Sequence, residues 1–254
     1  MNAHRTAPVR RPVVDGASST APHITSMTWR DGLFTHWPVD PDALRPHVPG
    51  QLTLETRDGR AWLSVLPFVL TNVGLRGIPS ITRLAFGELN VRTDVRHRGH
   101  PGLFFFSIDV GNSFVAATVG RAARLPVYRA RMRIGATEAN HVAFHSERQA
   151  GETAHDGLPR FDATYRPDGE VFTADPSTLT HWLTARRRFY APDADTVLTG
   201  EIAHDPWPLQ PATVTIHENT MRSANGLPTP TGDPLVHYAD ELSMTGSVPR
   251  RLEH

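Results

Sequence analysis

The sequence contains no cysteine. This absence excludes disulfide bonds, a thiolate nucleophile and cysteine-based metal sites, and it leaves the redox compartment of the protein undetermined. Lysine is absent as well, so that all 26 basic side chains are arginines. Without lysine, no side chain can form a Schiff base with a carbonyl substrate, bind pyridoxal phosphate covalently or complete a P-loop.

Two further absences concern the partners of the chain. The 26 basic residues are balanced by 26 acidic residues, and nothing indicates a nucleic-acid footprint or a polybasic membrane patch. No apolar run approaches the length of a membrane span. The sequence therefore predicts neither nucleic-acid binding nor membrane binding, and the cytoplasm is the default location.

The residues that are present suffice for one sizeable domain. The chain has 254 residues, of which 39% are hydrophobic, and barrels of this length commonly remain a single domain. Residues 1–25 are small, proline-dotted and aperiodic, which predicts a flexible arm and not a signal peptide. The folded domain is expected to span residues 26–249.

Most of this domain has the pattern of short strands. Seven runs combine strand composition with flanking turn residues. They are residues 61–70, 87–96, 102–110, 127–135, 141–147, 160–167 and 211–219. Only residues 40–48 and 175–190 begin like helices, each with an Asp-Pro pair. The pattern predicts a mainly β (α+β) fold, in which one antiparallel sheet forms a closed or cone-like barrel with a few flanking helices.

One predicted strand, GELNVRTDVR at residues 87–96, alternates strictly between polar and apolar side chains. Its polar face carries Glu88, Asn90, Arg92, Asp94 and Arg96. Antiparallel sheets often turn such a face to solvent, so the pattern alone leaves solvent and an internal cavity both open. The strand at residues 127–135 has a basic face. If either face points inward, the lumen suits an anionic or carbonyl-bearing ligand.

Several stretches carry a resemblance to a known family. In order, they are FTHWPVDPDALRPHVPGQL, DGRAWLSVLPF, ELNVRTDV, PGLFFFSIDV, LPVYRARM, HDPWPLQPA and PLVHYADEL, and they lie between Trp29 and Leu242. They resemble the YqjF-like family, which is defined by the DUF2071 domain and belongs to the acetoacetate decarboxylase-like superfamily. The resemblance implies a cone-like barrel of the acetoacetate decarboxylase type with a ligand cavity, but the family carries no assigned reaction.

The similarity to acetoacetate decarboxylase implies site residues one by one. Arg30 falls at the position of that enzyme's cavity arginine, and Glu88 falls at the position of one of its glutamates. A second glutamate is replaced by Ser64, and the paired lysines fall on Val127 and Tyr128. Schiff-base decarboxylation is therefore excluded, while an arginine and one carboxylate of the cavity remain.

The position of Glu88 indicates which way the polar face of its strand points. If Glu88 lies in the lumen, as in the family, the period of two places Asn90 and Arg92 on the same inward face. Asp94 and Arg96 lie further along the strand and are expected to approach the solvent-exposed rim. The resemblance thus favours an inward polar face over a solvated one.

Three residues are the catalytic candidates. An arginine such as Arg30 binds a carboxylate or enolate oxygen, Glu88 moves a proton, and Tyr128 donates to a developing oxyanion. These roles suit an enzyme of the lyase, isomerase or cyclase type that works by cofactor-independent dehydration, cyclisation, isomerisation or decarboxylation without a Schiff base. The residues expected to line the substrate pocket are Asn90, Arg92, Ser64, Val127, His36, Trp37, His204 and His237.

The same residues allow other interpretations. Glu88 with Arg92 or Arg30 can be a structural ion pair, because a buried ion is costly unless it is paired. The chain is then a non-catalytic protein that binds or senses a small molecule, or a structural module that forms homo-oligomers. A pocket carboxylate with a strongly shifted pKa would favour the enzyme, whereas charges that are all paired would favour the binding protein.

Metal and triad chemistry have little support in the sequence. Of the 14 histidines, His141 and His145 share a strand face, but at about 13 Å they are too far apart to bind one ion by themselves. The G-x-S-x-G pattern of a serine nucleophile is absent. We predict no metal and no cofactor, and the expected partner is a small molecule.

Overall fold

The computed structural model describes residues 21–79, 82–137, 141–149 and 158–252. Most of the expected N-terminal arm lies outside these ranges. His23 to Thr25, however, already belong to the first strand, so the sheet begins before residue 26. No helix within the described ranges is both long enough and apolar enough to span a membrane.

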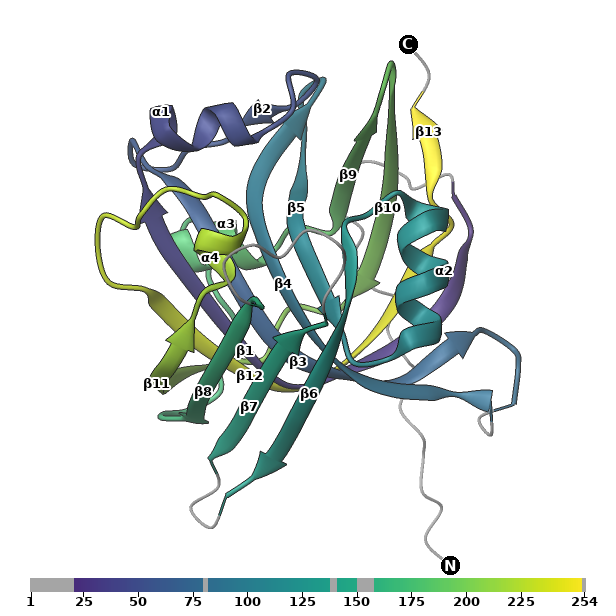
Figure 1. The fold of residues 1–254 in the computed structure, drawn as a ribbon, viewed down its shortest axis with the longest axis vertical. Coiled ribbons are helices and arrows are strands. Elements are labelled where there is room, and N and C mark those ends of the chain that lie inside the picture. The colour runs from purple at the N-terminus through teal and green to yellow at the C-terminus, as the bar shows by residue number, and fades with distance from the viewer. Residues whose placement is uncertain (1–20, 80–81, 138–140, 150–157, 253–254) are drawn as a thin grey trace, which may run out of the picture.

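Strands dominate the described chain, and the helices are short (Figure 1). The strands are β1 (His23–Val39), β2 (Thr53–Leu54), β3 (Ala61–Leu75), β4 (Leu84–His97), β5 (His100–Val110), β6 (Val127–Ala136), β7 (Val142–Arg148), β8 (Arg160–Pro167), β9 (Arg188–Asp193), β10 (Thr196–His204), β11 (Leu209–Asn219), β12 (Leu235–Ser247) and β13 (Arg250–Leu252). The helices are α1 (Pro41–Leu44), η1 (Arg45–His47), α2 (Ser113–Ala123), α3 (Leu179–Thr184) and α4 (Met221–Ala224). The predicted mainly β fold with few helices is confirmed.

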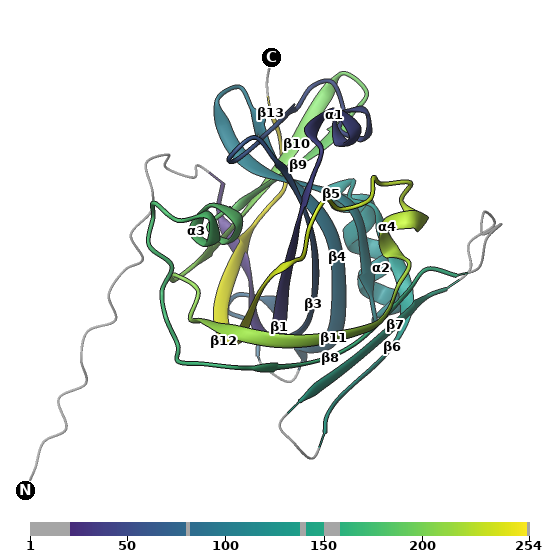
Figure 2. The ribbon, with the colours of Figure 1, turned by 90° about the vertical axis from the view of Figure 1, so that its left-hand side faces the viewer.

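The strands pair in the order β13-β10-β9-β5-β6-β7-β8-β11-β12-β1-β3-β4-β2, with additional pairings β10–β12 and β5–β4. The described strands therefore trace two circuits that share β12, β1, β3, β4 and β5. The seven-strand circuit continues through β9 and β10. The nine-strand circuit continues through β6, β7, β8 and β11, which curve along one side of the shared strands (Figure 2). Pairings are antiparallel except β5–β6 and β5–β9, which corrects the expectation of a wholly antiparallel sheet.

The shared strands are buried on both sides. Leu63 and Val91 pack into a core with Phe161 of the nine-strand circuit. Phe68 and Ile108 pack into a second core on the opposite side, which we call the inner face of the seven-strand circuit. Because successive side chains of a strand alternate in direction, each shared strand contributes to both cores.

A bulge in β1 changes which of its residues face inward. The register between β1 and β3 shifts after Arg30, and Asp31 adopts a φ of 50°. A Cβ atom at Gly32 would lie 2.0 Å from the indole of Trp29, so only glycine fits there. The extra residue brings Trp29 and Phe34 to the same inner face, where their rings stack with centroids 5.3 Å apart.

Helix α2 is not predicted by the sequence pattern. The Asn112 side chain accepts hydrogen bonds from the backbone N–H groups of Phe114 and Val115 at 3.0 and 3.1 Å, and Arg124 ends the helix in the left-handed region. The helix forms the crossover between β5 and β6. A crossover of this kind is what a parallel pairing requires.

Both expected helical segments contain a helix that is shorter than predicted. Asp40 caps α1, with Pro41 in its first turn. Helix α3 begins at Leu179 under a Thr178 cap, and not at Asp175, because the Asp-Pro pair lies in a turn before it. Residues 188–190, at the end of the second expected helical segment, belong to strand β9.

The basic face of β6 lies at the molecular surface. Arg129, Arg131 and Arg133 are exposed. The basic face of β6 therefore does not contribute to a cavity inside the seven-strand circuit. The polar face of β4 lies in the interior instead, since Asn90 and Asp94 are only 3% and 1% exposed.

Candidate functional site

The polar face of β4 points to the inner face of the seven-strand circuit. The cross-strand neighbours of Glu88 are Phe68 on β3 and Val110 on β5, and both belong to the inner-face core. Directly opposed residues point to the same side of a sheet. Glu88 therefore points inward, and so do Asn90 and Arg92 further along the strand. Glu88 and Arg92 are partly buried and keep accessible surface beside these apolar walls.

The Glu88 carboxyl group has a strongly shifted pKa. Burial raises the pKa of Glu88 to about 7, against the lowering effects of a hydrogen bond from Asn90 and the charge of Arg92. That hydrogen bond joins Asn90 Nδ2 to Glu88 Oε1 over 3.4 Å. Within the described ranges no ion pair holds Glu88. Its carboxyl group can therefore both bind and release a proton near neutral pH.

Arg92 is a partly buried cation that forms no ion pair with any residue the structure describes. Burial lowers the pKa of Arg92 to about 10, although Asp94 and Glu88 oppose the shift, so the guanidinium stays charged at neutral pH. Its Nε has no hydrogen-bond partner among the described residues. An unpaired buried charge is costly. A guanidinium in this state suits an anionic ligand such as a carboxylate.

Ser64 and His36 lie beside Arg92, and His237 lies near His36. Ser64 on β3 lies opposite both Arg92 and His36, and its Oγ is 2.7 Å from Nδ1 of His36. Burial, followed by the positive charges of Arg92 and His237, holds the pKa of His36 well below its usual value, so that imidazole is neutral. Within the described structure, Nε2 of His36 and Nδ1 of His237 have no partner. Both are buried polar atoms that would gain a hydrogen bond from a bound ligand or water molecule.

His204 completes an aromatic wall. Burial lowers the pKa of His204 to about 4, and its Nδ1 lies 2.6 Å from the backbone oxygen of Asp205. The ring of Trp207 is 4.8 Å from that of His204 and 4.9 Å from that of Trp29. A hollow of about 60 Å³ beside His204 and Trp207 has room for water but is smaller than a typical metabolite site.

A charge network that the sequence did not predict closes one end of the inner face. Arg186 places its Nε 3.3 Å from Asp94 and its Nη2 2.8 Å from Glu55, and Glu55 also pairs with Arg96 at 2.6 Å. Burial raises the pKa of Asp94 to about 7, while Arg186 and Arg92 lower it. The expected exposure of Asp94 is therefore wrong. The alternation of polar and apolar residues along β4 was the signal that could have predicted the burial of Asp94. No local sequence pattern links Arg186 to Glu55.

Arg30 lies outside this site. Its side chain is exposed, and its Nη2 is 2.9 Å from Glu241. Strict alternation back from His36 would turn Arg30 inward, but the extra residue at Asp31 reverses the direction. The expectation that Arg30 lines the cavity is corrected, and Arg92 provides the guanidinium of the inner face.

Two other candidates point away from the inner face. Tyr128 is 41% exposed, and the guanidinium of Arg148 lies 3.9 Å above its ring. Trp37 packs against the core of the nine-strand circuit. Their chain neighbours Val127 and His36 face the inner core or its polar cluster. Adjacent strand residues point to opposite sides, so only one member of each pair can line the site.

Solved structures with a similar fold include enzymes. An enduracididine biosynthesis enzyme, MppR, complexed with pyruvate has a TM-score of 0.65 at 14% identity, covering 98% of this chain and 99% of that one. An acetoacetate decarboxylase-like enzyme from Sphingomonas wittichii RW1 has a TM-score of 0.58 at 13% identity, covering 96% and 100%. Acetoacetate decarboxylase from Legionella pneumophila reaches 0.56 at 14% identity, covering 97% and 92%. The likeness shows an acetoacetate decarboxylase-like fold.

Sequence comparison identifies the family. Uncharacterized protein YqjF of Bacillus subtilis (strain 168) is 40% identical over 217 residues, which cover 85% of this chain and 87% of that protein. The model of DUF2071, described as an uncharacterized conserved protein, matches residues 26–243. The resemblance noted in the sequence is confirmed, and the chain belongs to the DUF2071 family.

Proposed function

We propose that the seven-strand circuit is a closed barrel whose lumen binds a small carboxylate with a neighbouring carbonyl group, and that Glu88 performs cofactor-independent acid/base chemistry on it. One observation carries the proposal: Arg92, whose guanidinium forms no ion pair with a described residue, and Glu88, whose carboxyl group has a pKa of about 7, share one inward strand face. The pyruvate complex of MppR, which has a similar fold, supports this ligand class.

The spacing of the two charged residues suits a small molecule. Residues four apart on a strand have Cα atoms about 13 Å apart, so the side chains of Glu88 and Arg92 leave room for a few atoms between them. Arg92 binds the carboxylate bidentately. The amide of Asn90 and the free ring nitrogens of His36 and His237 are then placed to hydrogen-bond the carbonyl oxygen.

Glu88 in this arrangement removes a proton from the carbon next to the carbonyl group. The electron pair of the broken C–H bond forms the C=C bond of the enolate, the π pair of the carbonyl group moves to its oxygen, and the charge of Arg92 stabilises the resulting enolate. A pKa of about 7 allows Glu88 to accept this proton and return it at neutral pH. Dehydration, isomerisation and cyclisation can all begin with this step.

Proton transfer can be measured before the natural substrate is known. We expect the protein to catalyse exchange of the C3 hydrogens of pyruvate with D₂O, followed by NMR. Arg92→Met should weaken pyruvate binding by roughly 10- to 100-fold, because a charge-assisted bidentate contact is lost. Arg131→Met, on the exposed face of β6, is the matched control and should behave as wild type. Binding without exchange would identify a binding or sensing protein instead, and absence of both would refute the proposed site.

A covalent route through an imine is expected to fail. The chain has no lysine, and Val127 stands where the resemblance places a reactive amine. Borohydride reduction in the presence of pyruvate should therefore leave every internal side chain unmodified, as read by peptide mass mapping. An adduct on an internal residue would contradict the acid/base mechanism.

A further inference from the structure

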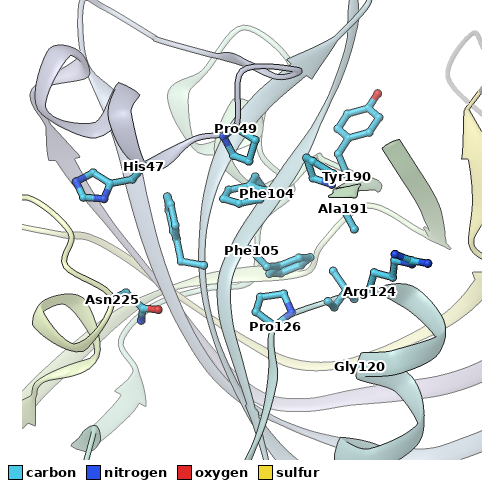
Figure 3. Close-up of a pocket in the computed structure, with 13 residues that line it drawn as sticks. His47, Pro49, Phe104, Phe105, Gly120, Arg124, Pro126, Tyr190, Ala191 and Asn225 are labelled. Atoms are coloured by element: carbon cyan, nitrogen blue, oxygen red, sulfur yellow. The ribbon is translucent and has the colours of Figure 1, made fainter. Parts of the chain in front are cut away.

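A groove opens at the edge of β5, where β6 and β9 diverge (Figure 3). Pairing with β6 covers Ile108 to Val110, and pairing with β9 reaches only Leu103. Between them, Phe104, Phe105 and Ser107 pair with β4 on one edge, and no described strand pairs with the other edge of residues 104–107. The sheet therefore has a gap at this point of the seven-strand circuit.

The groove has the size and lining of a small-molecule site. Its volume is about 550 Å³, within the usual range for such sites. Its walls are mainly aromatic and apolar, and they include Phe104, Phe105, Phe106, Leu125, Pro126 and Tyr190. The polar lining residues are His47, Asn225 and Arg124, and Arg124 forms an ion pair with Asp193. Such a lining favours an apolar group over a charged one.

Phe105 connects this groove with the inner face. It lies directly opposite Arg92 on β4, so it points to the side of the sheet that carries Glu88 and Arg92. Its ring packs against the inner-face core, 6.2 Å from the ring of Phe189. Phe105 also lies among the lining residues of the groove (Figure 3). Phe105 thus borders both the groove and the face that carries the Arg92 guanidinium.

We propose that the groove is the entrance to the lumen and binds an aromatic or branched apolar tail of the substrate, whose carboxylate reaches Arg92 past Phe105. The inference rests on the proposed function. It narrows the substrate class from small oxo acids in general to oxo acids with a bulky apolar side chain. Pyruvate fills only the inner part of this site, and the tail occupies the gap between β6 and β9.

Pyruvate and phenylpyruvate test the proposal, with dissociation constants measured by calorimetry on the full chain. Phenylpyruvate should bind roughly 10- to 100-fold more tightly, because its ring buries apolar surface in the groove. Leu125→Trp fills the groove and should remove most of this advantage, so that the ratio of the two dissociation constants approaches one. Arg92→Met should weaken the binding of both acids.

Phe114→Trp is the matched control, since it adds the same ring on α2, where Phe114 is 67% exposed, and it should change neither constant. If Leu125→Trp does not fold, as judged by its melting curve, Phe104→Ala replaces it, because it removes one wall and should reduce the same advantage.

Equal affinity for the two acids, or an advantage that survives these groove variants, would overturn the groove proposal. If pyruvate binding nevertheless depended on Arg92 in that case, the proposed function would still be supported. Phenylpyruvate binding that is sensitive to Leu125→Trp but not to Arg92→Met would show a separate site, and would contradict both the shared substrate and the role of Arg92.

Discussion

Replacing Glu88 with glutamine is expected to slow the exchange of the C3 hydrogens of pyruvate by roughly 10²- to 10⁴-fold, because the amide cannot accept the proton. Glutamine keeps the shape of the side chain, so pyruvate affinity should change little. The wild-type rate should rise with pH and level off above about pH 7, since the carboxylate is the active form and burial raises the pKa of Glu88 to about 7. NMR exchange rates across this range measure both effects.

Folding stability provides a second readout for Glu88→Gln. The pKa of Glu88 in the folded protein, about 7, lies above its ordinary value of 4.5, so the folded state holds the proton more tightly. The stabilisation that this tighter proton binding gives the folded state is fully present below about pH 4.5 and is lost as the pH rises to about 7. Because glutamine does not ionise, Glu88→Gln does not lose this stabilisation, and its free energy of unfolding should exceed that of the wild type at about pH 8. A less stable variant would indicate a structural ion pair, and unchanged exchange would remove Glu88 from the mechanism.

Arg186→Met is expected to lower the free energy of unfolding by about 3–5 kcal/mol at about pH 8, because it strands the buried carboxylate of Asp94. Glu55 keeps its second partner, Arg96. The loss should be smaller at about pH 5, since burial raises the pKa of Asp94 to about 7 and the protonated group needs no cation. Urea denaturation at the two pH values measures the difference.

The pairing itself can be isolated by a double-mutant cycle with Asp94→Asn, in which the double variant should recover part of the stability lost in Arg186→Met. Arg131→Met, an arginine on the exposed face of β6, should stay within about 0.5 kcal/mol of wild type. An equal loss at both pH values would show that Arg186 acts by packing, for example on the ring of Trp182 4.8 Å away, and not through Asp94.

The strands were largely predictable from the sequence because their alternation and turn residues are local signals. Strand β8 has the predicted bounds at both ends. Helix α2 was not predictable in the same way: the segment SFVAATVGRAA contains β-branched residues and Gly120, which disfavour a helix, and only Asn112 marks its start. The parallel pairing of β5 with β6 depends on that helix and was missed with it.

Alternation also located the centre of the candidate site, since Glu88, Asn90 and Arg92 share one face. The side of the sheet that this face meets was set by contacts between distant strands, which no local pattern contains. The position of Arg30 was predicted wrongly because a bulge in β1 reverses the alternation of its side chains between the two faces of the sheet. A bulge has only a weak signal in the sequence. Arg186 was missed because its contact with Asp94 joins segments far apart in the chain.

The sharing of five strands between the two circuits has a consequence for how the molecule comes apart. Neither circuit can be excised as an independent unit, because removing one would strip a buried face from every shared strand. Unfolding should therefore be cooperative across both circuits, without a stable half-molecule. No boundary inside this sheet would let recombination exchange one circuit and keep the other, so substitutions on the inner face and in the surrounding layer are expected to depend on each other through the shared strands.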